Sequence, residues 1–331
     1  MKPRELKQAL RLAFRNRFPV LLVGQPGVGK SDIMAQTAAE EGMDLILSHP
    51  VVSDPTDYKG MPFVVEGKAE FLPFGELRRI VEAVRPTVFF LDDLGQASPA
   101  VQAAAMQLLL ARRVGDNRVS DAVTFVAATN RRQDRAGVQG ILEPVKSRFV
   151  SILHLEPDVD DWCRWAALHG MPHELISFIR FKPDMLVAFT PSRDMVNSPC
   201  PRTVAFVGSL LNAGLPDELA FEMIAGAAGS AFATEFLAYR RIVDRLPDID
   251  AILDQPEKAP VPDEPSVLYA LCGALASRAS ETTFGSIVSY SFRLPPEFSV
   301  LLIRESAARD RSLTETEEFG RWAAEHSEVL V

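Results

Sequence analysis

The stretch that decides the fold is "VLLVGQPGVGKSDIMAQTAAE", Val20 to Glu40, in which an apolar run leads through three glycines into a lysine, a serine and a helix-like pattern. Residues 24–31 fit the pattern G-x-x-x-x-G-K-[ST]. Glycines let backbone N–H groups curl around an anion, and the positive end of the following helix dipole adds to the attraction. The stretch therefore predicts a phosphate-binding loop between a buried strand and a helix.

In this motif the lysine reaches the β- and γ-phosphates of a nucleotide and the serine hydroxyl binds Mg²⁺. We therefore expect ATP and Mg²⁺ as cofactors, with Ser31 as a metal ligand. The alternative is a strand-to-helix turn without a ligand. The candidate nucleotide-binding residues are Gly24, Gln25, Pro26, Gly27, Val28, Gly29, Lys30, Ser31 and Asp32.

The composition is that of an ordinary globular chain, since 47% of the 331 residues are apolar and 24% are charged. This length favours two compact units over one. The net charge of −9 argues against a bulk attraction to nucleic acid or to anionic membranes. The exception is the N-terminus, where Lys7, Arg11 and Arg15 recur at helical spacing, as either a solvated face or a surface for a nucleotide or a partner.

The three cysteines, Cys163, Cys200 and Cys272, lie far apart in the sequence, which argues against a disulfide framework or a zinc site. No apolar run reaches the length that spans a bilayer, and the N-terminus lacks the apolar region of a signal peptide. We expect a cytoplasmic protein with no membrane partner.

Up to about residue 156, apolar runs alternate with amphipathic stretches, which is typical of a parallel sheet covered by helices on both faces. Strands are expected at residues 20–23, 45–48, 88–91, 124–127 and 150–155, and helices at 30–41, 74–84 and 99–112. Two hairpins are expected, one with arms 61–65 and 69–72 and one with its tip near 115–117. From residue 157 onward the pattern indicates helices, with 254–265 as an extended linker.

Polar residues follow two of the expected strands. The apolar run that ends at Leu91 is followed by Asp92 and Asp93. A phosphate-bound Mg²⁺ needs a hard oxygen ligand near Ser31, which Asp92 can supply, while Asp93 could orient or polarise the attacking water. Asn130 ends the next apolar strand, where its amide either holds that water or caps a turn.

Two arginines complete the candidate catalytic set of Asp93, Asn130, Arg148 and Arg202. Arg148 precedes the fifth expected strand, and Arg202 begins a helix in the second half of the chain. An arginine can stabilise charge on the γ-phosphate from the same chain or from a neighbour. A lone arginine is otherwise a surface residue.

Together these residues resemble an AAA+ ATPase, in which Asn130, Arg148 and Arg202 correspond to sensor 1, the arginine finger and sensor 2. The hairpins resemble the inserts of the helix-2-insert clade, and "DPTDYKG", "SRF" and "SPCPRTVAF" most resemble the MoxR-type members, which are related to the dynein-like AAA proteins. The resemblance covers residues 1–240. One departure is Asp93, since the family usually has glutamate there. Because a misplacement of about 1 Å can cost on the order of 100-fold in rate, slow hydrolysis is one hypothesis.

The resemblance implies an α/β fold, a P-loop NTPase αβα sandwich with a five-stranded parallel sheet in the order 5-1-4-3-2, followed by an all-α lid and C-terminal helices. The expected domains are residues 1–156 for nucleotide binding, 157–250 for the lid and 251–331 for a linker and helical extension. It also implies a homo-oligomeric ring, commonly a hexamer, in which Arg148 reaches the neighbour's γ-phosphate. A protein client is implied as well, often with a von Willebrand factor A domain protein as partner.

Three functions follow from this reading. The first is an ATP-driven remodeller of protein partners, for which Phe63, Phe71 and Phe74 either grip a client or pack within the ring. The second is a slow-hydrolysing, nucleotide-gated binding module or switch. The third is a nucleic-acid motor or loader, which the basic N-terminus favours and the acidic balance opposes. The cluster of Arg131, Arg132 and Arg135 also favours it, unless those arginines contact nucleotide or a neighbouring subunit.

Overall fold

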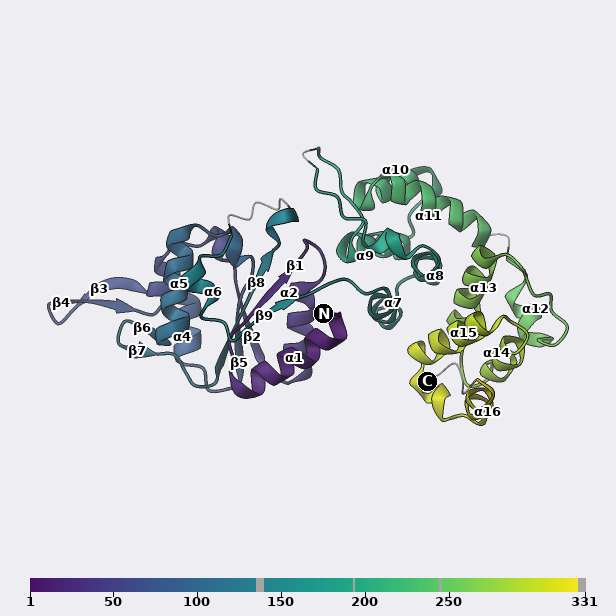
Figure 1. Cartoon of the computed structure of the whole chain (residues 1–331), viewed down its shortest axis with the longest axis horizontal. Coiled ribbons are helices and arrows are strands. Elements are labelled where there is room, and N and C mark those ends of the chain that lie inside the picture. The colour runs from purple at the N-terminus through teal and green to yellow at the C-terminus, as the bar shows by residue number, and fades with distance from the viewer. Residues whose placement is uncertain (135–139, 193, 244–245, 327–331) are drawn as a thin grey trace. The chain divides into compact units, whose positions relative to one another are not determined.

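The computed structural model in Figure 1 describes residues 1–134, 140–192, 194–243 and 246–326. The chain forms two compact units, which divide between Pro157 and Asp158. None of the helices in the described ranges is long and apolar enough to span a membrane.

The centre of the first unit is a five-stranded parallel sheet in the order β2-β5-β8-β1-β9. Counted along the chain, these strands stand in the order 2-3-4-1-5. This is the predicted 5-1-4-3-2 order read from the other edge, so the predicted fold class is confirmed. The strands are β1 Val20–Gly24, β2 Asp44–Ser48, β5 Thr87–Leu91, β8 Val123–Asn130 and β9 Ser151–His154.

Helices cover both faces of the sheet, because side chains along each strand alternate between the two faces. On β5, Val88 and Phe90 pack in one cluster with Leu6 and Met34 of the first two helices, whereas Phe89 packs on the other side of the sheet. The helices of this unit are α1 Pro3–Asn16, α2 Lys30–Glu40, α3 Thr56–Lys59, α4 Gly75–Val81, α5 Pro99–Ala111 and α6 Glu143–Lys146.

The end of α4 differs from prediction for an identifiable reason. Helix α4 ends at Val81 rather than at residue 84, close before Arg85-Pro86, where the proline disfavours helical conformation at the residue before it. Strand β8 extends beyond residues 124–127 to Asn130, the polar residue predicted to end this strand, and Asn130 is in register with Gly24 of β1. The longer strand carries Asn130 to the start of the phosphate-binding loop.

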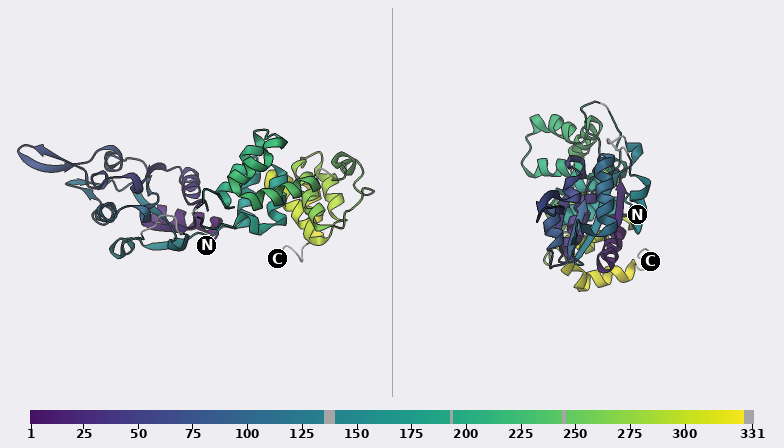
Figure 2. Two further views of the ribbon diagram at one scale, coloured as in Figure 1. Left: turned by 90° about the horizontal axis from the view of Figure 1, so that it is seen from above. Right: turned by 90° about the vertical axis from the view of Figure 1, so that its left-hand side faces the viewer.

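Both expected hairpins are present. Strands β3 Met61–Val65 and β4 Lys68–Leu72 pair antiparallel, as do β6 Arg113–Val114 and β7 Asn117–Arg118. Glu66 and Gly67 have φ values of 50° and 76°, the left-handed conformation that a two-residue turn requires. Strand β4 therefore begins one residue earlier than predicted. Figure 2 shows that β3 and β4 project from the first unit.

The basic face of α1 is paired within its own unit. Lys7 and Arg11 each lie 2.7 Å from a carboxylate oxygen of Glu40, and Arg11 also lies 3.0 Å from Glu41. These carboxylates stand at the C-terminal end of α2. The face therefore packs α1 against α2 through ion pairs.

The second unit is helical throughout its described residues, as predicted. Its helices are α7 Val159–Leu168, α8 His173–Phe181, α9 Pro201–Asn212, α10 Asp217–Ala228, α11 Ser230–Val243, α12 Ile249–Asp254, α13 Pro265–Ser277, α14 Phe284–Ser291, α15 Pro296–Arg309 and α16 Glu317–Glu325.

The segment expected as a linker, residues 254–265, connects α12 to α13 but packs closely onto the unit. The Tyr290 hydroxyl of α14 donates to the Pro260 carbonyl at 2.7 Å, Arg293 donates to the Pro256 carbonyl at 2.5 Å, and Ala259 is buried. The proline-rich segment therefore packs against the helices of the C-terminal core and forms part of its boundary.

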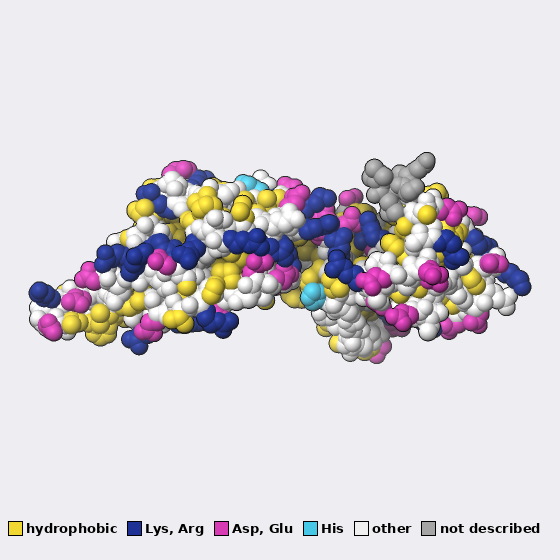
Figure 3. Space-filling model, turned by 90° about the horizontal axis from the view of Figure 1, so that it is seen from below, with side chains coloured by type: hydrophobic (Ala, Val, Ile, Leu, Met, Phe, Trp, Pro, Cys, Tyr) yellow, Lys and Arg dark blue, Asp and Glu magenta, His cyan; other side chains and the backbone are white. Residues whose placement is uncertain are grey.

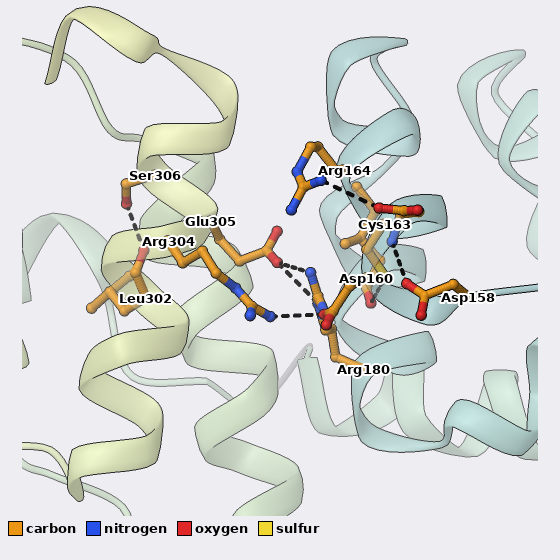
Figure 4. A network of polar contacts seen from close by, with 11 residues as sticks. Asp158, Asp160, Cys163, Arg164, Arg180, Leu302, Arg304, Glu305 and Ser306 are labelled. Atoms are coloured by element: carbon orange, nitrogen blue, oxygen red, sulfur yellow. Dashed lines mark hydrogen bonds and ion pairs between the residues drawn. The ribbon is translucent and has the colours of Figure 1, made fainter. Parts of the chain in front are cut away.

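A network of ion pairs joins α7, α8 and α15 (Figure 4). Arg180 of α8 donates to Glu305 of α15 at 2.6 and 2.9 Å and also pairs with Asp160 of α7. Arg304 donates to Asp160 at 2.8 Å. The side chains of Arg180 and Glu305 are only 10% and 8% exposed, so this pair is well shielded from solvent.

Candidate nucleotide-binding site

The loop between β1 and α2 has the backbone that a phosphate cradle needs. Gly29, the N-cap of α2, has a φ of 101°, which a residue with a side chain rarely adopts. At Gly24, a Cβ atom would lie 3.0 Å from the Leu155 carbonyl oxygen, so only glycine fits beside β9 without displacement. The N-terminus of the 11-residue helix α2 begins directly after this loop, with its positive dipole end at the loop.

Lys30 brings a buried cation to the loop. Its side chain is 6% exposed, and its ammonium group donates to the carbonyls of Gly24 and Gln25, each at 3.1 Å. It also donates to Oδ1 of Asn130 at 2.7 Å. All three acceptors are uncharged oxygens, which anionic phosphate oxygens can replace as stronger partners. The loop, the helix dipole and Lys30 together fit a nucleotide's phosphates.

Ser31 and Asp92 lie side by side although 61 positions separate them in the sequence. The Ser31 hydroxyl donates to Oδ2 of Asp92 at 2.5 Å, and the backbone N–H of Asp93 donates to Oδ1 at 3.0 Å. A hydroxyl and a carboxylate are hard oxygen ligands of the kind Mg²⁺ prefers. No group of three or more His, Cys, Asp and Glu side chains that could hold a metal occurs in the described ranges.

Asp93 and Asn130 extend this cluster across the ends of β5 and β8. The Asn130 amide nitrogen donates to Oδ1 of Asp93 at 3.2 Å, while its oxygen accepts from Lys30. Asp93 has a φ of 55°, a left-handed conformation uncommon for a residue other than glycine, of the kind found at functional sites. The structure thus brings together Lys30, Ser31, Asp92, Asp93 and Asn130.

Asp32, Arg148 and Arg202 take part in none of the hydrogen bonds described above. Asp32 is exposed in the first turn of α2. Arg148 is half-buried between α6 and β9, and its Nε has no hydrogen-bond partner among the residues that the structure describes. Arg202 is exposed near the start of α9, in the second unit.

Arg131 was predicted as part of a basic cluster that contacts nucleic acid, nucleotide or a neighbouring subunit, but its contact with Gln25 of the loop was not predicted. Arg131 forms an ion pair with Asp134 at 2.9 Å and donates to the side chain of Gln25 at 3.3 Å, whereas its neighbour Arg132 is exposed. Arg135 lies outside the described residues. The only sequence signal was the i, i+3 spacing of Arg131 and Asp134.

Part of the chain matches a known protein family. Residues 20–157 match the family AAA, described as the ATPase family associated with various cellular activities. Among curated proteins there is no match to the chain. The similar solved structures include a RuvB mutant from Thermotoga maritima, 18% identical with a TM-score of 0.43, which covers 82% of this chain and 81% of that chain.

Another similar structure is the Thermotoga maritima RuvB Holliday junction branch migration motor, 18% identical with a TM-score of 0.41, which covers 87% of this chain and 86% of that one. At this level of similarity we transfer no activity from RuvB. The matched residues 20–157 include the sheet and the loop described above. This part of the chain is therefore similar to an AAA-family ATPase domain.

Proposed function

We propose that the chain is a ring-forming ATPase of the MoxR type, which couples ATP binding and hydrolysis to the remodelling or activation of a protein partner. The observation that carries this proposal is the convergence of Lys30, Ser31, Asp92, Asp93 and Asn130 at the phosphate-binding loop.

In this proposal the loop and the N-terminus of α2 hold the β- and γ-phosphates. The ammonium group of Lys30 then donates to phosphate oxygens in place of the uncharged oxygens that accept its hydrogen bonds in this structure. Ser31 and Asp92 hold Mg²⁺, which when bound neutralises the charge that develops on the phosphates. Asp93 accepts a hydrogen bond from the attacking water and takes its proton. Asn130 orients both Asp93 and Lys30.

Calorimetric titration with Mg·ATP tests the nucleotide site directly. We expect saturable binding by the wild-type chain and none by Lys30→Met at the same concentrations, because that variant lacks the buried ammonium group. No heat from the folded wild-type chain even at millimolar Mg·ATP would overturn the proposal.

The ring is proposed because Arg148, whose Nε has no hydrogen-bond partner within the described ranges, can complete a neighbour's site. We expect ATPase activity per subunit to rise with protein concentration and to be lost in Arg148→Ala. Lys146→Ala is the matched control, since Lys146 is also basic and pairs with Glu143 at the protein surface. Activity that stays flat across dilution, together with an active Arg148→Ala, would contradict the ring.

The client is proposed to contact the β3–β4 hairpin, where Phe63 and Phe71 are 53% and 46% exposed. A hexamer and a von Willebrand factor A domain partner belong to the same proposal. We expect the double variant Phe63→Ser, Phe71→Ser to keep its basal ATPase activity and to lose stimulation by the client. Loss of basal activity would instead indicate that the phenylalanines pack within the ring.

A second candidate function, a slowly hydrolysing switch, is favoured by Asp93. This carboxylate is one methylene shorter than the usual glutamate, and the Asn130 amide holds it within the cluster. If the switch is correct, wild-type turnover is slow and Asp93→Glu raises it. Brisk wild-type hydrolysis with no gain in Asp93→Glu would remove this candidate.

The observations that favoured a nucleic-acid motor are weaker in the structure. Lys7, Arg11 and Arg131 all pair with carboxylates of their own unit. On the face shown in Figure 3, the Lys and Arg side chains of the first unit form a band with acidic side chains interspersed. A paired charge attracts phosphate less than a free one, so this function is not our proposal.

A further inference from the structure

We propose that Arg131 is a positioning residue for the phosphate-binding loop. Its guanidinium group, held in place by Asp134, fixes the side chain of Gln25 and so orders the loop before nucleotide arrives. This inference rests on the proposed function of the site. It assigns Arg131, one of the basic cluster named in the sequence, to the binding of ATP.

Arg131 and Asp134 form a two-point ion pair in which the carboxylate is buried and the arginine is partly exposed. Nε of Arg131 donates to Oδ2 of Asp134 at 2.9 Å and Nη2 donates to Oδ1 at 3.0 Å. Asp134 is 6% exposed, and its backbone N–H donates to the Arg131 carbonyl at 3.1 Å. Two parallel hydrogen bonds fix the plane of a guanidinium group, so the direction of its remaining N–H bonds is fixed as well.

The same Nη2 also donates to Oε1 of Gln25 at 3.3 Å. A guanidinium group has donors only, so the amide atom that faces it is the oxygen, and Nε2 points elsewhere. Gln25 is 7% exposed, and Nε2 is buried without a hydrogen-bond partner among the described residues. A glutamine buried in this way keeps its orientation through the contact with Arg131.

Adjacent residues at the end of β8 therefore hold both ends of the loop. Asn130 accepts from Lys30, and Arg131 donates to Gln25, whose own carbonyl also accepts from Lys30. Between these anchors lie Gly27 and Gly29, the residue type that loses the most conformational freedom on ordering. A loop ordered in advance binds its ligand more tightly, because less entropy is lost on binding.

The inference predicts an effect on affinity more than on chemistry. We expect Arg131→Met to raise the Kd for Mg·ATP about tenfold, the size of effect that one hydrogen bond to a charged group can produce. Turnover at saturating ATP should stay within about twofold of wild type, since Arg131 reaches Gln25 rather than the reacting atoms. The matched control is Arg132→Met, which removes the same charge from the exposed neighbouring residue and should bind as wild type.

A double-mutant cycle separates positioning from a general effect on the fold. Gln25→Met removes the acceptor but leaves the pair of Arg131 and Asp134 intact, so it tests the contact even if Arg131→Met does not fold. We expect Gln25→Met to raise the Kd for Mg·ATP about tenfold as well. The double variant should also show a rise of only about tenfold, because each change removes the same contact between Arg131 and Gln25.

Three outcomes would overturn the inference. Wild-type affinity in folded Arg131→Met or in Gln25→Met would do so, as would losses that multiply to about 100-fold in the double variant. An equal loss of affinity in Arg132→Met would show that the positive charge near the site, and not the contact with Gln25, determines the affinity for Mg·ATP. If the wild-type chain itself binds no Mg·ATP, the proposed function fails together with this inference, which distinguishes that failure from the other outcomes.

Discussion

Each of the two units contains a buried cluster of charged side chains, and the clusters differ in what their charges contact. In the first unit, Lys30 makes hydrogen bonds to the Gly24 carbonyl and to Asn130, and Ser31 donates to Asp92, contacts that a nucleotide and a metal can replace. In the second unit, Arg180 pairs with Asp160 and Glu305, so cation and anions neutralise one another. The comparison indicates that the first cluster is arranged to exchange partners and the second to keep them.

The strongest test of this difference between the two clusters is to replace Arg180. Arg180→Met leaves Glu305 buried without its cation, so we expect it to destabilise the protein by about 3–5 kcal/mol in urea denaturation. The double variant Arg180→Met, Glu305→Leu should recover most of that loss, because it leaves no unpaired charge. A loss below about 1 kcal/mol in the single variant would show that the network is not structural.

The corresponding change in the first unit is Asn130→Ala. It removes both the acceptor of Lys30 and the donor to Asp93, so we expect ATP turnover to fall on the order of 100-fold, with a smaller loss of stability than in Arg180→Met. Steady-state ATPase assays check this. The control is Gln133→Ala, at an exposed position in the short 3-10 helix that follows β8; equal losses in the two variants would contradict the prediction.

A pH titration sharpens the comparison within the second unit. Burial acts to raise the pKa of Asp160, but its hydrogen bond and charge interaction with Arg180 outweigh this, and the pKa is lowered from 3.8. A carboxyl with a lowered folded-state pKa stabilises the protein above its unfolded pKa and loses that contribution as the pH falls. We expect Asp160→Asn to cost up to about 1 kcal/mol at pH 7, and this cost should shrink progressively as the pH falls from 3.8 through the lower folded-state pKa. A cost that is independent of pH would contradict the assignment.

The smallest effect is expected at the surface pairs of α1. Arg11 and Glu40 have side chains that are 37% and 40% exposed, so Arg11→Met should cost only about 0.2–1 kcal/mol. Salt screens exposed charges, and the difference from wild type should shrink in 1 M NaCl. Urea denaturation at low and high salt measures this; a loss as large as that in Arg180→Met would remove the distinction between exposed and buried pairs.

Local signals were sufficient for much of the nucleotide-binding unit. The five strands and both hairpins were predicted, because strand period, turn residues and the phosphate-loop spacing are all read over short windows. The order of the strands came instead from the resemblance to the AAA+ family. The end of β8 at Asn130 was also predicted, whereas its pairing with Gly24 depends on a partner strand about 100 residues away in the chain.

By itself, the sequence determined that a phosphate-binding loop follows the first strand and that carboxylates and an amide end the neighbouring strands. Only the tertiary structure decided that Arg131, rather than Arg132, contacts Gln25 across 106 positions, and that Arg180 meets Glu305 across 125. The physical reason is that motifs record the backbone conformations and side-chain types that a ligand needs, whereas ion-pair partners are set by how distant elements pack.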